Sequence, residues 1–173
     1  MRTIHSFAPI GDSNSMILIL GSMPGRMSLE YGQYYAHPRN VFWKIMHDLT
    51  AIDLTQPYDT RTAGLRHKRI AVWDVLKACT REGSLDSAID ESSIVPNDFA
   101  SFLADHPAIT SIFFNGAKAD NAYRKHIWQT LSDRSKGLKY QRLPSTSPAN
   151  AAMPYPEKLA RWEVILHEPK SFS

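Results

Sequence analysis

The sequence predicts an α/β fold, a three-layer α/β/α sandwich around a short parallel sheet of four strands. Four apolar stretches have the length and composition of strands, and segments with helical spacing lie between them. Each stretch is followed closely by glycine, aspartate, asparagine or serine residues. Because ligands of such folds bind beyond the carboxyl ends of the parallel strands, these polar ends mark the expected site.

The strands are expected at regular intervals along the chain. Residues 16–21 form a continuous apolar run closed by glycine, which is typical of a buried parallel strand. The second strand lies within residues 67–74, with its apolar part at 70–73. Residues 108–114 predict the third strand, and residues 138–143, which alternate in polarity, predict the fourth.

Helices are expected where apolar residues recur at helical spacing between these strands. Asp98 is a helix-start signal, and Pro156 suits a first helical turn. The stretches 22–38 and 144–154 are expected to be loops. The expected helices are residues 40–49, a segment that starts at Asp98, a segment that runs from Gly116 through Tyr123 and Trp128, and residues 156–166.

Length and composition predict one globular domain, residues 1–173, with a frayed end at 169–173. Hydrophobic residues make up 43% and charged residues 21% of the chain, and a net charge of +3 permits an anionic partner. The single cysteine, Cys79, excludes a disulfide within the chain and favours a reducing cytoplasm. No stretch has the apolar length of a signal peptide or a membrane span, so we expect a cytoplasmic protein.

The charges are unevenly distributed. Residues 82–105 contain acids and no lysine or arginine, whereas residues 118–142 are strongly basic. This split favours a molecule with one face toward phosphate groups. The alternative is a pair of ordinary solvated faces.

The loop at residues 22–38 is longer than a strand-to-helix connection requires, and such loops are often functional. Gly21 and Gly25 would let the backbone approach a ligand closely. Tyr34 and Tyr35 are candidates to stack on a flat aromatic ring.

His37 and Asn40 could place polar atoms beside such a ring. Asn40 also stands at the start of the expected helix, where it could act as the N-cap, and His37 could stabilise the loop by a hydrogen bond. The sequence alone leaves these two interpretations open for both residues.

Two motifs carry a resemblance to a known family. Gly-Ser-Met-Pro-Gly at 21–25 and Tyr-Ala-His-Pro-Arg-Asn-Val-Phe-Trp-Lys at 35–44 resemble the first motif of mismatch-specific uracil/thymine DNA glycosylases. Their variant residues are more similar to the hypoxanthine-DNA glycosylase branch of the uracil-DNA glycosylase superfamily. Pro-Ser-Thr-Ser-Pro-Ala-Asn at 144–150 is similar to the second motif of that branch and follows the last strand.

The resemblance implies a monomeric enzyme that acts on DNA containing a damaged base. It turns a deaminated base, hypoxanthine first of all, out of the DNA and hydrolyses its glycosidic bond. No metal or cofactor is needed, because the protein can hold the base, aim dipoles at it and place one water. Because the matched motifs contain no lysine except Lys44 at the end of the first one, the enzyme is expected to be monofunctional and to leave an abasic site.

The chain departs from its relatives at three positions. Many relatives have Asn or Asp at the position of Met23 to place the attacking water, which a methionine cannot do. Uracil-specific enzymes have His at the position of Ser145, and a bulky Leu that wedges into the duplex at the position of Ala149. A wedge must then come from a neighbour such as Met153, or be weak.

The resemblance also implies roles for single residues. Asn40 orients the water or polarises the base. Tyr35 stacks on the extruded base in place of the Phe of relatives, and backbone groups of Ser22 and Met23 contact the base edge. Asp74 ends the second strand and accepts from an N–H of the base, unless it is a solvated or helix-capping residue.

The remaining motif residues receive supporting roles. Asn115 either contacts the base or is structural. Ser145 and Ser147 donate to phosphates beside the extruded nucleotide, in a loop that Pro148 stiffens. The other motif residues are expected to contact DNA (Ala149, Asn150) or to support the site (Gly21, Pro24, Gly25, His37, Pro38).

Three alternative functions stay open at this point. Met23 is compatible with a catalytically silent DNA-binding module on the same fold. An enzyme that excises uracil rather than hypoxanthine is the second alternative. A hydrolase for a small nucleotide or another ligand is the third, since the fold hosts many activities.

Overall fold

The computed structural model describes residues 2–167 and contains the predicted four-stranded parallel sheet. Its strands are β2 (Ile17–Gly21), β3 (Ile70–Asp74), β6 (Ser111–Asn115) and β7 (Lys139–Leu143), in the order β3-β2-β6-β7. All three pairings are parallel. The fold class expected from the sequence is therefore confirmed, while the expectation for residues 169–173 falls outside the described part of the chain.

Alternating side chains of the central strand β2 enter two separate hydrophobic clusters. Ile17 and Ile19 belong to one cluster, and Leu18 and Leu20 to the other. This follows from the period of two along a strand, which sends neighbouring side chains to opposite faces of the sheet. The continuous apolar run of β2 is thus explained, because both of its faces are buried.

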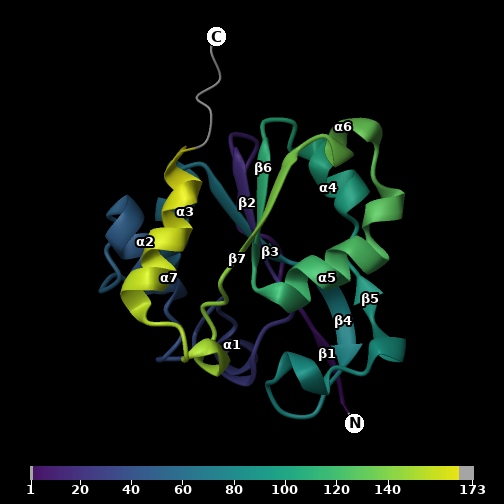
Figure 1. The fold of residues 1–173 in the computed structure, drawn as a ribbon, viewed down its shortest axis with the longest axis horizontal. Helices are drawn as coiled ribbons and strands as arrows, with labels where there is room; N and C mark the ends of the chain where they lie inside the picture. The colour runs from purple at the N-terminus through teal and green to yellow at the C-terminus, as the bar shows by residue number, and fades with distance from the viewer. Residues whose placement is uncertain (1, 168–173) are drawn as a thin grey trace.

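Helices cover both faces of the sheet. Figure 1 shows α2, α3 and α7 on one side of the strands and α4 and α5 on the other. No helix within residues 2–167 is both long enough and apolar enough to cross a membrane. The α-helices are α1 (Arg26–Tyr31), α2 (Phe42–Thr50), α3 (Tyr58–His67), α4 (Phe99–Asp105), α5 (Ala117–His126), α6 (Asp133–Lys136) and α7 (Tyr155–Trp162). Short 3-10 segments are η1 (Asp86–Ala88), η2 (Glu91–Ser93), η3 (Trp128–Thr130), η4 (Pro148–Asn150) and η5 (Glu163–His167).

Several elements differ from the sequence-based expectation. Helices α1 and α6 lie in stretches without a helical pattern, and α3 has a weakly amphipathic sequence in which Thr62 and Leu65 are buried. A second, antiparallel sheet of β1 (Thr3–His5), β4 (Leu76–Thr80) and β5 (Val95–Pro96) was not expected either. Local sequence patterns do not predict this sheet, because its strands pair across a long distance in sequence, as Thr3 does with Thr80.

The parallel sheet brings the carboxyl ends of its strands to one end of the molecule. Gly21 is paired with Asp74, and Asn115 with Leu143, so the last residues of neighbouring strands lie side by side. In Figure 1, α1, which follows β2, and the chain that follows β7 both lie at the lower end of the view. A hydrogen bond of 3.1 Å from the Val41 N–H to the Thr146 carbonyl joins the two motif loops there.

Candidate functional site

A cavity of about 1180 Å³ opens at this end of the sheet. It is bounded by the loops that follow β2, β6 and β7 and by a segment around η1. Every candidate residue from the sequence lines it except Pro38, which is exposed. The candidates that line it are Gly21, Ser22, Met23, Pro24, Gly25, Tyr34, Tyr35, His37, Asn40, Asp74, Asn115, Ser145, Ser147, Pro148, Ala149, Asn150 and Met153.

Gly21 is the point where two buried polar side chains converge. A Cβ atom at this position would lie 2.6 Å from Asp74 Oδ1 and 3.2 Å from the Tyr35 hydroxyl oxygen. A side chain at position 21 would therefore force the Asp74 side chain, and with it the Tyr35 hydroxyl, to shift. Gly25 differs, since a Cβ there would meet nothing within 4 Å. At Gly21, the groups that come close to the backbone are thus the side chains of Asp74 and Tyr35.

Asp74 holds a buried carboxyl group whose Oδ2 has no hydrogen-bond partner among the described residues. The residue is 3% exposed. Burial and the nearby charge of Asp86 raise the pKa of Asp74 to about 7, although Arg81 acts in the opposite direction. A buried polar atom without a partner is costly, so an open position of this kind at a cavity is suited to a ligand's polar group.

Asp86 brings a second carboxylate to the cavity, and the sequence analysis did not assign it a role. The Ser22 hydroxyl donates to Asp86 Oδ1 at 2.7 Å. The Arg81 side chain is 5% exposed and donates to the Pro24 carbonyl at 2.6 Å, which ties the first motif to β4. Within residues 2–167, Asp74 and Asp86 are the two carboxylates that line the cavity.

Tyr35 is packed on one side and contributes to the cavity wall. Its ring stacks on Phe42 with a centroid distance of 4.1 Å, and its backbone has a φ of 57°, which is rare for a residue with a side chain. The hydroxyl is buried and has no hydrogen-bond partner within residues 2–167, and burial together with the charge of Asp74 raises its pKa. The Tyr34 ring is instead part of the core, with its hydroxyl bonded to the Ala8 carbonyl at 2.9 Å.

Asn40 and His37 both have structural hydrogen bonds as well as a place on the cavity wall. Asn40 Oδ1 accepts from the Phe42 N–H at 3.0 Å at the start of α2, and His37 Nδ1 accepts from the Arg39 N–H at 3.1 Å. The capping bond leaves the Asn40 carboxamide nitrogen without a partner in the described part of the chain. Met23 is 6% exposed and packs in a hydrophobic cluster, so its side chain is mainly a core group.

Asn115 joins the third strand to the second motif. Its Nδ2 donates to the Thr146 hydroxyl and its Oδ1 accepts from the Thr146 N–H, both at 2.9 Å. Both ends of the amide are therefore engaged within the protein, which fits the structural interpretation of Asn115. Thr146 is 1% exposed and was not singled out from the sequence, because its burial depends on this contact.

The second motif is further held by bonds within its own loop. Ser145 Oγ accepts from the Ser147 N–H, and Ser147 Oγ accepts from the Ala149 N–H, both at 3.2 Å. Each hydroxyl keeps its own hydrogen available for donation. Beneath the loop, the buried Lys158 donates to the Asn150 carbonyl at 3.1 Å, and burial lowers its pKa.

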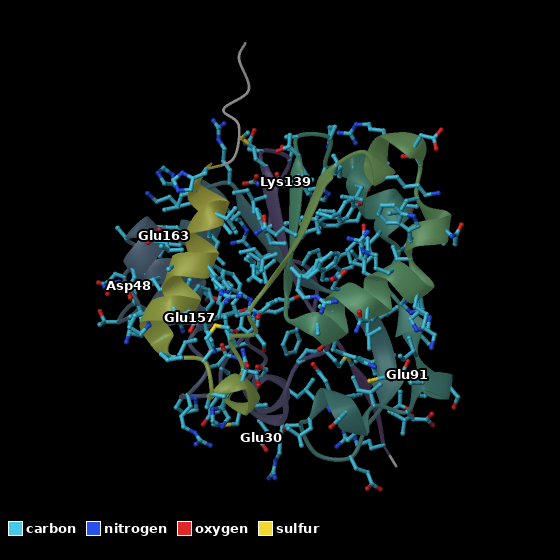
Figure 2. All side chains as sticks on the ribbon, in the orientation of Figure 1. Glu30, Asp48, Glu91, Lys139, Glu157 and Glu163 are labelled. Atoms are coloured by element: carbon cyan, nitrogen blue, oxygen red, sulfur yellow. The ribbon has the colours of Figure 1, made fainter. Side chains whose placement is uncertain are left out.

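The basic stretch 118–142 is largely engaged in ion pairs. Lys118 and Lys125 both contact Glu91 of the acidic stretch, and Asp120 binds two arginines. Figure 2 shows Glu91 on the α5 side of the molecule, away from Glu30 of α1. The uneven charge therefore favours the interpretation as solvated faces. Cations nevertheless line the cavity, namely Arg26, Arg39, Arg142 and Arg161.

Within residues 2–167, no group of three or more His, Cys, Asp or Glu side chains is arranged to hold a metal ion. The polar atoms available to a ligand at the cavity are instead the Asp74 carboxyl, the Asn40 amide and the serine hydroxyls of the second motif. No motif in the sequence indicated that Asp86 belongs to the site, because its segment comes to the cavity only through the placement of β4 in the fold. The acidic residues around it were the one signal available.

Comparisons with known proteins find relatives that match most of the chain. The model of the family described as the Uracil DNA glycosylase superfamily matches residues 8–166. A Methanosarcina acetivorans protein named "Hypoxanthine DNA glycosylase" is 36% identical over 162 residues, 93% of this chain and 96% of the relative. A protein of the same name from Methanosarcina barkeri is 40% identical over 147 residues, 84% of this chain and 87% of the relative.

The fold also has a solved counterpart. The solution NMR structure of a Methanosarcina acetivorans protein, provisionally named a uracil DNA glycosylase, superimposes with a TM-score of 0.78. The two sequences are 35% identical, and the match covers 95% of this chain and 96% of that one. The four-stranded parallel sheet is thus shared with a structure of close sequence.

Gly21→Ala tests the convergence at the end of β2. We expect a loss of stability of about 1–3 kcal/mol, because the new methyl group forces Asp74 and Tyr35 to move in a packed environment. Gly25→Ala is the matched control and should change stability by less than about 1 kcal/mol, since its φ of −70° suits alanine. Urea unfolding measures both variants, and equal stabilities would refute the crowding at position 21.

Asp74→Asn tests the buried carboxyl through the pH dependence of stability. Between the ordinary pKa of 3.8 and the folded value of about 7, the unfolded chain loses this proton while the folded chain keeps it, so stability falls as pH rises. The variant cannot ionise and should gain on the wild type through this window, by roughly 4 kcal/mol at pH 8. Melting temperatures from pH 4 to pH 8 measure the gain, and a difference independent of pH would contradict it.

Proposed function

The chain belongs to the uracil DNA glycosylase superfamily, and from this premise we propose that it excises hypoxanthine from DNA. The observation that carries the proposal is the pair of relatives named hypoxanthine DNA glycosylase, which match this chain over most of its length. The cavity supports the proposal, because it places an aromatic ring, a buried carboxyl group and an amide around one space.

The base is held by Tyr35 and Asp74 in this proposal. The Tyr35 ring is supported on one face by Phe42 and offers a flat surface to a base turned out of the duplex. Hypoxanthine presents an N–H next to a carbonyl group on its edge. The Asp74 carboxyl accepts from that N–H, and in its protonated form its O–H also donates to the neighbouring oxygen. Backbone groups of Ser22 and Met23 complete the contacts with the base edge.

The reaction exchanges the bond between the base nitrogen and the sugar carbon for a bond between that carbon and a water oxygen. Positive charge builds on the sugar and negative charge on the departing base. Asn40 is the residue that orients the water or polarises the base, through the amide nitrogen that the capping bond leaves available. One proton of the water ends on the base, and the other stays on the oxygen as part of the new sugar hydroxyl group.

The enzyme is monofunctional in this proposal and leaves an abasic site. A lyase reaction of a glycosylase needs an amine that attacks the sugar. No lysine of the described part of the chain lines the cavity, and the buried Lys158 is engaged with the Asn150 carbonyl. The chemistry then stops once water has replaced the base.

The DNA partner is held by the second motif. The Ser145 and Ser147 hydroxyls donate to phosphates beside the extruded nucleotide, with Pro148, Ala149 and Asn150 in the same loop. The compartment, oligomeric state and domain count stay predictions from the sequence: a cytoplasmic, monomeric protein with one glycosylase domain.

Asn40→Ala is expected to slow hypoxanthine release by at least about tenfold, because one preorganised polar group is lost. The measurement uses a duplex with a single deoxyinosine, followed by alkali, which breaks the strand at abasic sites. A uracil duplex run in parallel reports the preference for the base. Equal rates for the wild type and the variant would move the catalytic role to another residue.

Two further variants separate chemistry from folding. Asn40→Ala also removes the acceptor for the Phe42 N–H, whereas Asn40→Asp keeps an acceptor and removes the amide N–H groups. We expect Asn40→Asp to be slow as well while it melts close to the wild type. Asn14→Ala changes an exposed asparagine of a distant turn and should leave the rate unchanged.

Ser145→Ala should weaken binding to an abasic-site duplex by on the order of 1 kcal/mol, the contribution of one hydrogen bond. A fluorescence anisotropy titration at fixed salt measures the change. Ser92→Ala, which alters an exposed serine within η2, is the control. Equal affinities for Ser145→Ala and the wild type would remove this serine from the DNA contacts.

A further inference from the structure

Leu85 is an apolar side chain held in the open at the mouth of the cavity. It is 57% exposed and lines the cavity beside Asp86. A single exposed leucine is common on protein surfaces and by itself indicates nothing. The position of this one is unusual because the chain on both sides of it is fastened to the first motif.

Three hydrogen bonds fasten the segment 83–86. Arg81 Nε donates to the Gly83 carbonyl at 3.1 Å, and Gly83 has a φ of 72°, which turns the chain. The Arg26 N–H donates to the Ser84 hydroxyl at 3.0 Å. On the other side of Leu85, Asp86 accepts from the Ser22 hydroxyl at 2.7 Å. The backbone is therefore held while the leucine side chain keeps its contact with solvent.

Elsewhere around the cavity, the described residues offer no comparable group. The second motif places Ala149 there, whose single methyl group is too short to reach between stacked bases. Met153, the other apolar candidate, is half-buried. Leu85 is thus the large apolar side chain at the cavity that is both exposed and supported from two sides.

A duplex that gives up one base leaves a gap in its stack. Proteins that distort DNA commonly fill such a gap with an apolar side chain such as Leu, Ile, Phe or Met. We propose that Leu85 is the wedge of this protein, entering the duplex at the place of the extruded nucleotide. This assignment rests on the proposed function, and it moves the wedge from the loop after β7 to the segment between β4 and η1.

The wedge explains why a rigid segment carries this residue. A side chain that must displace a stacked base costs the least conformational entropy when its backbone is already ordered, because no loop has to be fixed on binding. Arg26 and Arg39 also line the cavity and supply cations for phosphate groups of the DNA. The Arg26 guanidinium is 76% exposed, with Glu30 as its pairing partner.

The test compares Leu85→Ala with the wild type on one oligonucleotide in two forms. With deoxyinosine in a duplex, we expect release of hypoxanthine to slow at least about tenfold, because extrusion is no longer assisted. With the same strand unpaired, the rates should agree within about twofold, since there is no stack to open. Leu85→Met should restore most of the duplex rate, because methionine also fills the gap.

A second readout needs no catalysis. A duplex with 2-aminopurine next to the deoxyinosine gains fluorescence when its stack is opened. The wild type should raise the signal and Leu85→Ala should not. Leu54→Ala and Leu166→Ala change leucines that are 42% and 49% exposed and do not line the cavity, so both should behave as the wild type.

The outcomes separate the two ideas. A fluorescence rise that depends on Leu85 without base release would keep the wedge and refute the proposed function. Base release from the duplex that is as fast in Leu85→Ala as in the wild type would overturn the wedge and keep the function. A loss of activity on both forms of the strand, or a loss in Met153→Ala instead, would also overturn it.

Discussion

The site depends on the missing side chain at Gly21. Because this residue ends the central strand β2, anything that stands over it reaches the middle of the sheet's carboxyl edge. Asp74 Oδ1 and the Tyr35 hydroxyl occupy the space that a Cβ atom would take. Asp74 and Tyr35 can come this close to the end of β2 only because position 21 is a glycine.

The same arrangement has an energetic cost. Among the described residues, one carboxyl oxygen of Asp74 and the Tyr35 hydroxyl are buried without hydrogen-bond partners, and Asp86 adds a negative charge near Asp74. Buried polar groups of this kind reduce stability unless a ligand satisfies them. Arg81 offsets part of the cost, since it brings a cation to the two aspartates and at the same time holds the first motif through Pro24. The buried polar groups at the floor of the cavity therefore lower the stability of the fold, and the contacts of Arg81 recover part of it.

The walls of the cavity are built from hydrogen bonds that connect loops far apart in sequence. Thr146 bonds to Asn115 of β6 and to Val41 at the start of α2, so one buried threonine joins the loops after β2, β6 and β7. The close contact between Gly116 and Ser145 has the same effect. The segment with Leu85 is fastened in a similar way to the first motif. A site made from loops becomes rigid in this manner, which a preorganised pocket requires.

The sequence by itself determined the parallel sheet, the order of its strands along the chain and the set of residues that follow them. It could do so because apolar runs and motif spacing are local properties, and residues such as Gly21, Asp74 and Asn115 each end a run. Only the tertiary structure decided what these residues do. It engaged Asn115 with Thr146, placed Tyr34 in the core, and brought Asp86 and Leu85 to the cavity through a strand whose partner is Thr3 to His5. Contacts between distant segments leave no local pattern in the sequence. For this reason the sequence predicted the strand ends that form the floor of the site, but not Asp86 and Leu85 at its rim.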